Sequence, residues 1–129
     1  SKEIVFIPKS YKDKLQQYIE KYNIKVSDKV DVWKLICYPF VDEYITKESL
    51  VENMSQLNNL LFAQEEVELI RKRISTLIRW WLTFTMENSS LIHYDVIQAR
   101  KNIYFFNPFY SRFYWYTMKI ALKGFGVNQ

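Results

Sequence analysis

Apolar residues recur every three or four positions along most of the chain, and polar residues fill the positions between them. This period is that of one buried face of an α-helix, whereas a half-buried strand alternates every second residue. The first residues alternate poorly up to Pro8, which predicts an extended arm or at most a short edge strand. Helices are predicted at about 11–22, 28–44, 46–61, 65–87, 91–106 and 109–123.

Local signals indicate where these helices begin and end. Ser10, Ser27 or Asp28, and Thr46 are the expected N-caps, because their side-chain oxygens can accept hydrogen bonds from the first turn. Pro39 lies inside the second pattern, where its missing N–H either kinks the helix or starts a new one. Gly124 stands where a glycine commonly follows the end of a helix.

Each pattern also predicts a face that points into the core. The expected inward residues are Val30, Trp33, Cys37, Phe40 and Tyr44 in the second helix, Leu50, Met54, Leu57 and Leu61 in the third, Val67, Ile70, Ile74, Leu77 or Ile78, Trp81 and Phe84 in the fourth, Ile92, Val96, Ala99 and Ile103 in the fifth, and Phe109, Phe113, Tyr116 and Ile120 in the sixth.

The predicted fold class is therefore all-α. Only two glycines and three prolines occur in 129 residues, which disfavours a turn-rich β-sandwich or barrel. We expect a compact bundle of four to five helices over residues 28–129. An extended basic N-terminal arm and a short helix, residues 1–27, precede it and either attach to the bundle or reach away from it.

Composition narrows the class of protein. With 49% hydrophobic and 25% charged residues, the chain is an ordinary globular sequence. Cys37 is the single cysteine, which excludes a disulfide within the chain. No signal peptide is recognisable, and no apolar run approaches the ~18 residues of a membrane-spanning helix. We expect an intracellular protein or a component of a virion.

Little in the sequence points to catalysis. His93 is the single histidine, so no pair of histidines with metal-ligand spacing exists. Cys37 falls on an apolar stripe and is expected to be packing material, and His93 is expected at a surface or helix start. Both glycines lie at the far C-terminal end, which rules out a phosphate-cradling loop. We expect a non-enzymatic protein without metal or cofactor.

Charge is distributed in three blocks. Residues 1–34 carry eight lysines against five acids, residues 35–70 carry one lysine against seven acids, and residues 71–129 carry nine bases against two acids. Positive blocks attract polyanions, and a negative block between them can pair within or between molecules. The candidate nucleic-acid-binding residues are Lys9, Lys12, Lys14, Lys21, Arg71, Lys72, Arg73, Arg79, Arg100, Lys101 and Arg112.

Aromatic residues make up 18% of the chain and concentrate between Tyr104 and Tyr116. The last helix is apolar on most sides, so either it is central or its outer side is covered by another molecule. About half of these rings are expected in the core, most of the rest at a protein interface, and fewest in base stacking. The candidate interface residues are Trp80, Tyr104, Phe105, Tyr110, Tyr114 and Trp115.

These features favour one hypothesis and leave an alternative. The first is a self-assembling helical protein that engages nucleic acid through phosphate contacts, such as a viral or phage packaging protein. The alternative is a small helical protein–protein interaction module, such as a viral or bacterial effector, with an exposed aromatic surface. A membrane surface is the least favoured partner, since the basic and aromatic last helix has no clear anchor.

Overall fold

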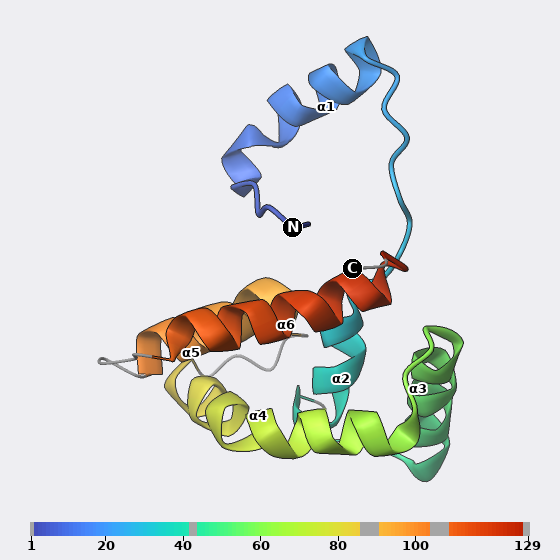
Figure 1. The fold of residues 1–129 in the computed structure, drawn as a ribbon, viewed down its shortest axis with the longest axis vertical. Helices are drawn as coiled ribbons and strands as arrows, with labels where there is room; N and C mark the ends of the chain where they lie inside the picture. The colour runs from blue at the N-terminus through green and yellow to red at the C-terminus, as the bar shows by residue number, and fades with distance from the viewer. Residues whose placement is uncertain (1, 42–43, 86–90, 104–108, 128–129) are drawn as a thin grey trace.

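The computed structural model describes residues 2–41, 44–85, 91–103 and 109–127 (Figure 1). Within these ranges every regular element is helical, which confirms the predicted all-α class. A 3₁₀ turn, η1 (Lys9–Tyr11), leads into α1 (Lys12–Lys21). The elements that follow in the described ranges are α2 (Val32–Val41), α3 (Lys47–Asn59), α4 (Gln64–Thr85), α5 (His93–Ile103) and α6 (Tyr110–Gly124).

The central helix is α2, which contacts α3, α4, α5 and α6. α4 also packs on α5, and α5 packs on α6. Trp33, Ile36 and Cys37 on the inner face of α2 are completely buried, and burial of each large side chain contributes about 2 kcal/mol. The indole Nε1 of Trp33 donates a hydrogen bond to the carbonyl of Thr117 at 3.1 Å, so this core side chain also ties α2 to α6.

Pro39 lies within α2, and the helix continues through it. A proline has no N–H, so the carbonyl of Leu35, four residues earlier, lacks its usual helical donor. Two side chains supply replacements: Asn53 Nδ2 at 2.9 Å and an Arg71 guanidinium nitrogen at 3.2 Å. The hydrogen bond that Pro39 removes is therefore replaced by side chains from α3 and α4. These replacement bonds also fix how the two helices meet α2.

The start of α2 differs from the prediction. Asp31 caps it, because Oδ1 accepts from the N–H of Trp33 at 2.9 Å, and Ser27 makes only a local contact with the N–H of Lys29. The second oxygen, Oδ2, accepts from the N–H of His93 at 2.8 Å, at the start of α5. One carboxylate thus caps two helices, a role that the spacing around Ser27 and Asp28 gives no sign of.

Both ends of the region before α2 are attached to the helices behind it. The N–H of Ile4 lies 3.2 Å from Met118 Sδ, and the ring of Phe6 meets the rings of His93 and Tyr94 edge-on at 5.4 and 5.3 Å. At the other end, Lys29 Nζ donates to the carbonyl of Phe125 at 2.7 Å. The start of the N-terminal arm is therefore packed against the helices. The chain then runs away from them through α1 and returns to them at Lys29.

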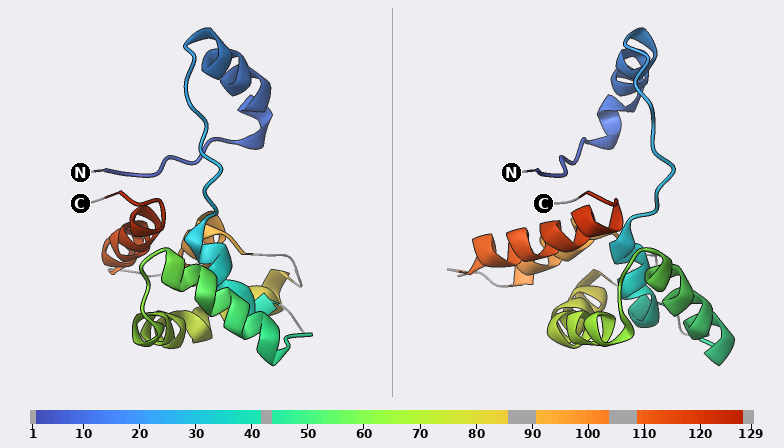
Figure 2. Two further views of the ribbon diagram at one scale, coloured as in Figure 1. Left: turned by 90° about the vertical axis from the view of Figure 1, so that its right-hand side faces the viewer. Right: turned by 45° about the vertical axis from the view of Figure 1, so that its right-hand side comes forward.

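Between these two attachments α1 stands away from the other helices (Figures 1 and 2). None of its residues is buried, and its apolar residues are exposed or half-buried. Val30, expected on the inner face of the second helix, lies in the exposed connection instead. In Figure 1, α6 lies between α1 and α4, which places α1 at the opposite end of the molecule from α4.

Several other predictions hold at the level of local structure. Thr46 and Ser49 form a reciprocal cap at the start of α3, with both hydrogen bonds at 3.1 Å. The predicted inner face of α4 is buried at Val67, Ile70 and Ile74. The expected core positions that the structure leaves exposed are Tyr44, Leu50, Leu61, Phe84, Ile92 and Phe109, and the side chain of Ile103 lies outside the described residues.

Gly124 was predicted to follow the end of the last helix, but Gly126 has that role. The residue after the helix end in the left-handed region is Gly126, with φ of 71°, and the N–H groups of Gly126 and Val127 close the last turn of α6. Gly124 is still helical and buried. A Cβ atom there would lie 2.6 Å from Cβ of Val32, so this glycine lets α6 approach α2 closely.

Candidate nucleic-acid interface

One face of α6 alternates aromatic and basic side chains. Phe109, just before α6, is followed by Phe113, Tyr116 and Lys119 at steps of four and three, Arg112 lies beside Phe113, and Lys123 continues the series. The predicted core face contained the three aromatic residues of this set, but Phe113 and Tyr116 are only half-buried and Phe109 is 55% exposed. Thr117, Met118, Ala121 and Leu122, round the helix, face the core with Ile120.

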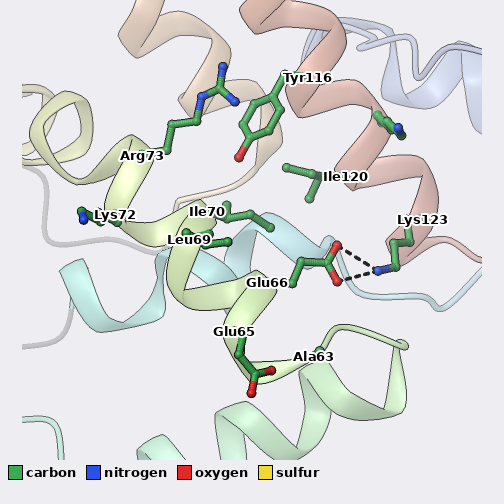
Figure 3. A pocket seen from close by; sticks show the side chains of 11 residues that line it. Ala63, Glu65, Glu66, Leu69, Ile70, Lys72, Arg73, Tyr116, Ile120 and Lys123 are labelled. Carbon is green, nitrogen blue, oxygen red and sulfur yellow. Dashed lines mark hydrogen bonds and ion pairs between the residues drawn. The ribbon is translucent and has the colours of Figure 1, made fainter.

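The C-terminal part of this face, with Tyr116, Lys119 and Lys123, lines a groove between α4 and α6, which we call the basic groove (Figure 3). The groove encloses about 1060 Å³. Ile70 and Ile120 are almost fully buried beneath it, whereas Leu69 on the α4 side is 68% exposed. Arg73 reaches from α4 toward the ring of Tyr116 on α6, and this contact closes one end of the groove.

Beyond that contact lies a smaller hollow of about 310 Å³ between α4, α5 and α6. Three arginines from three helices line it, namely Arg73, Arg100 and Arg112. Arg73 lies between the two hollows and lines both, so they follow one another along α6, and we call them together the basic track. Sequence positions 73, 100 and 112 are thus brought together by the fold, as the phosphate-binding hypothesis requires.

Each of these arginines lies over an aromatic ring. The guanidinium carbon of Arg73 is 4.1 Å from the ring centre of Tyr116, that of Arg100 is 5.4 Å from Phe113, and that of Arg112 is 5.5 Å from Phe109. A guanidinium that lies over a ring is attracted by the electrons of that ring, which helps to hold it in place. This geometry suits bidentate hydrogen bonds to phosphate oxygens, or the insertion of a base against a ring.

Charge on the rim of the basic groove is predominantly positive. Lys72, Arg73, Lys119 and Lys123 lie there against Glu65 and Glu66. Lys123 pairs with Glu66 at 2.8 Å, and its ammonium also lies 4.2 Å from the ring centre of Phe62. Burial raises the pKa of Tyr116, and the charge and hydrogen bond of neighbouring Arg73 partly oppose this shift, so its hydroxyl stays neutral.

Arg71 has a structural position. Its guanidinium donates to the carbonyl of Ile36 at 2.9 Å, to that of Leu35 at 3.2 Å and to Asn53 Oδ1 at 2.7 Å. Burial lowers the pKa of Arg71. An arginine is not deprotonated in proteins, so the group is a cation held by three protein oxygens. We therefore remove Arg71 from the set of phosphate-binding candidates.

The remaining predicted basic residues lie apart from the basic groove or on its rim. Lys72 is on the rim, whereas Arg79 and Lys101 are exposed and line neither hollow. The N-terminal candidates are exposed on η1 and α1: Lys9, Lys12, Lys14 and Lys21.

The predicted interface residues fall into two groups. Trp80 is 54% exposed and stacks on exposed Phe84 at 5.9 Å, near the end of α4. On α6, Trp115 is exposed, Tyr110 and Tyr114 are half-buried, and their rings contact one another in series. The hydroxyl of Tyr114 donates to Glu3, which raises the pKa of Tyr114 to about 12. Tyr104 and Phe105 lie outside the described residues.

The two reactive side chains singled out in the sequence are both buried. Cys37 is in the core, where burial raises the pKa of its thiol, so it stays protonated. His93 begins α5, which agrees with the expected helix start, but its side chain is buried and not at the surface. Its Nε2 lies 3.0 Å from Thr117 Oγ1, and because that hydroxyl donates to the carbonyl of Tyr114, it accepts from the imidazole. Burial lowers the pKa of His93 to about 4.

Sequence reasoning missed Tyr116 and Phe113 as site residues and left Lys119 and Lys123 out of the binding set. A signal for them was present, because basic residues interleave with aromatic ones on the same face of the sixth predicted helix.

Two searches of the described ranges gave no positive result. No group of three or more histidine, cysteine, aspartate or glutamate side chains there is placed to hold a metal ion. Among the same residues, no helix combines the length and apolar character needed to cross a membrane. Comparison with known protein families, curated proteins and solved structures found no match to this chain.

Proposed function

We propose that this protein is a non-enzymatic, self-assembling helical protein that binds nucleic acid through phosphate contacts along the basic groove. The observation that carries the proposal is the convergence of Arg73, Arg100 and Arg112, each stacked on a ring, beside the lysines of the groove rim. Phosphate oxygens are the anions that stacked guanidinium groups bind best, and rings beside them support bases.

The dimensions of the track favour a strand over a single anion. From Phe109 to Lys123 the face of α6 runs for fourteen residue steps, which is about 21 Å of helix. Phosphates of one nucleic-acid strand follow each other at a few ångströms, so several fit along this length. A concave groove with an apolar floor and the half-buried ring of Tyr116 at one end suits a single strand better than the rigid, convex duplex.

The test is binding of a fluorescent oligothymidylate to the purified protein, followed by anisotropy as salt rises from about 50 to about 200 mM. Affinity is expected to fall steeply, because each phosphate contact releases a counterion. The double variant Arg73→Glu with Lys119→Glu should lose at least about tenfold in affinity per residue. The matched control is Lys34→Glu with Lys47→Glu, which changes the net charge equally at exposed positions outside the groove. This control should retain much more of the affinity for the oligonucleotide. A salt-independent affinity, or equal losses in the two variants, would contradict the proposal.

The second candidate function is a protein–protein interaction module. The exposed stacked pair Trp80 and Phe84 favours it, because large rings seldom remain on a surface without a partner. If this function is the correct one, Trp80→Ala abolishes binding to a protein partner, and the oligonucleotide shows no affinity for the wild-type chain.

A further inference from the structure

The smaller hollow of the basic track, which we call the arginine hollow, concentrates positive charge more than the basic groove does. Arg73, Arg100 and Arg112 line it, and no carboxylate is among the described side chains of its lining. The lining of the basic groove has four bases against two glutamates, and one of these glutamates pairs with Lys123. The arginine hollow therefore gathers three cations around about 310 Å³, whereas the much larger groove of about 1060 Å³ is partly neutralised.

The walls of the arginine hollow place these cations on several sides of a small space. The three arginines come from α4, α5 and α6, so they approach from three helices. Two of the rings that lie against them, Phe109 and Phe113, are part of the same lining. Thr76 adds a hydroxyl group from α4, and Leu77 is buried beside it. Charged donors on several sides, with apolar walls between them, suit a compact and multiply charged anion.

The arginine hollow lies at one end of the basic track. Arg112 is in the first turn of α6, which begins at Tyr110, whereas Lys123 is in the last turn. The contact between Arg73 and Tyr116 separates the hollow from the groove (Figure 3). A strand that follows the groove from Lys123 toward the start of α6 therefore reaches the arginine hollow last. This position suits the end of a strand.

The end of a strand differs from its middle in charge. A terminal phosphate is a monoester with about two negative charges near neutral pH and three strong acceptor oxygens. A phosphodiester within the strand carries about one charge, because its third oxygen is bonded to the next sugar. Three guanidinium groups offer more charge and more donors than a phosphodiester can use, and a monoester uses more of both.

We propose that the arginine hollow binds the terminal phosphate monoester of a single nucleic-acid strand whose following phosphates lie in the basic groove. This inference rests on the proposed function and deepens it, because it names the strand end as the ligand of the hollow. A strand that ends in a hydroxyl group places a phosphodiester there instead. Such a strand keeps its contacts in the groove and binds more weakly.

The test compares oligothymidylates of equal length that end in hydroxyl groups, in a 5′-phosphate or in a 3′-phosphate. A dye on an internal base leaves both ends free, and anisotropy at one salt concentration gives the affinity of the purified protein for each. A terminal phosphate is expected to raise the affinity about tenfold over the hydroxyl form. The end that gives the gain shows the direction of the strand, and a gain at both ends shows that strands bind in either direction.

Two controls separate recognition of the monoester from the effect of added charge. A methyl ester on the terminal phosphate converts it into a phosphodiester and should remove most of the gain. Arg112→Gln, in the arginine hollow, should reduce the gain to less than about twofold. Lys119→Gln removes an equal charge from the basic groove, so it should lower the affinities for both forms and leave their ratio unchanged. Both residues are exposed, and circular dichroism should show wild-type helix content.

Arg112→Lys gives a further check, because it keeps the charge and loses the planar fork, so only part of the gain should remain. Equal affinities for the phosphate and hydroxyl forms would overturn the inference, as would a gain that survives the methyl ester or Arg112→Gln. If these results accompany steep salt dependence, the inference fails and the proposed function stands. If no form binds, the proposed function itself fails.

Discussion

The two sides of α4 present grooves of different size and charge. Toward α6 the groove is wide, carries four basic side chains against two glutamates on its rim, and has Ile70 and Ile120 at its floor. Toward α3 the groove is about half as large, is walled by aliphatic residues, and is lined by one glutamate and one arginine. Both grooves use the first half of the same helix, because a rotation of about 100° per residue presents different side chains to α6 and to α3.

The grooves also differ in what holds their walls. Arg71 binds α3 and α4 to α2 through a permanent cation on carbonyl oxygens. On the α6 side, His93 meets Thr117 as a neutral imidazole, and Trp33 binds the carbonyl of the same threonine. A permanent charge does not respond to moderate acid, whereas an imidazole does. The contacts that hold α6, on the side of the basic groove, are therefore more sensitive to acid than the contacts of Arg71.

The largest effect is expected at Arg71. Truncation in Arg71→Ala removes three hydrogen bonds from a charged donor and leaves the Leu35 carbonyl with Asn53 alone, at a cost of about 4 kcal/mol in unfolding free energy. The neighbouring Lys72→Ala should change that free energy by less than about 0.5 kcal/mol, because Lys72 is exposed. Urea denaturation of both variants measures the contrast, and similar values would remove the distinction between the two residues.

The second-largest effect is expected from acid, which should lower the stability of the chain through His93 on the α6 side. The pKa of His93 is about 4 in the folded chain, below the ordinary 6.5, so the unfolded chain binds the proton first as pH falls. Stability is complete above about pH 6.5, falls by about 2 kcal/mol at pH 5, and falls by about 3 kcal/mol at pH 4.

Denaturation between pH 7 and pH 5 measures this slope, because most carboxylates stay ionised there. His93→Gln is expected to be less stable at pH 7 and to lack the slope. If the free energy of unfolding of the wild type stays constant across this pH range, then protonation of the His93 imidazole does not destabilise the folded chain.

A smaller effect concerns binding at the α6 side. Arg112→Gln removes one guanidinium from the track, and affinity for oligothymidylate should fall about tenfold. Arg79→Gln removes an equal charge outside the track and should lower affinity by less than about twofold through net charge alone. Anisotropy titrations at one salt concentration compare the two, and an equal loss would indicate diffuse attraction by the whole surface.

The smallest effect is at the rim. Glu66→Gln breaks the pair with Lys123, in which both side chains are 40% exposed, and should cost less than about 1 kcal/mol of stability. The same substitution removes a negative charge from the basic groove, so affinity for nucleic acid should rise. The direction of the change in affinity is the decisive measurement. A fall in affinity would indicate that the nucleic-acid strand binds outside the basic groove.

Local chemistry in the sequence predicts the helices well. The Thr46 cap and the stripe at Val67, Ile70 and Ile74 follow from neighbouring residues alone, and the structure contains them. The repair of Pro39 depends on side chains that are distant in sequence, and spacing along one helix carries no information about them. The double cap by Asp31 escapes prediction for the same reason.

The candidate site was predictable in its residue types and less so in its arrangement. Arg73, Arg100 and Arg112 stand out as basic positions, but their convergence depends on how three helices pack. On α6 more than one face is apolar, so periodicity cannot decide which one the core takes. Packing selected the face with Thr117 and Ala121, where small side chains and Gly124 permit close approach.

The attachment of α1 at both ends determines more than its exposure. A helix on a single flexible tether would sample many directions, but two fixed supports restrict the angle at which α1 leaves the molecule. The direction in which α1 points is therefore set by contacts far from it, at Ile4 and Phe6 on one side and at Lys29 on the other.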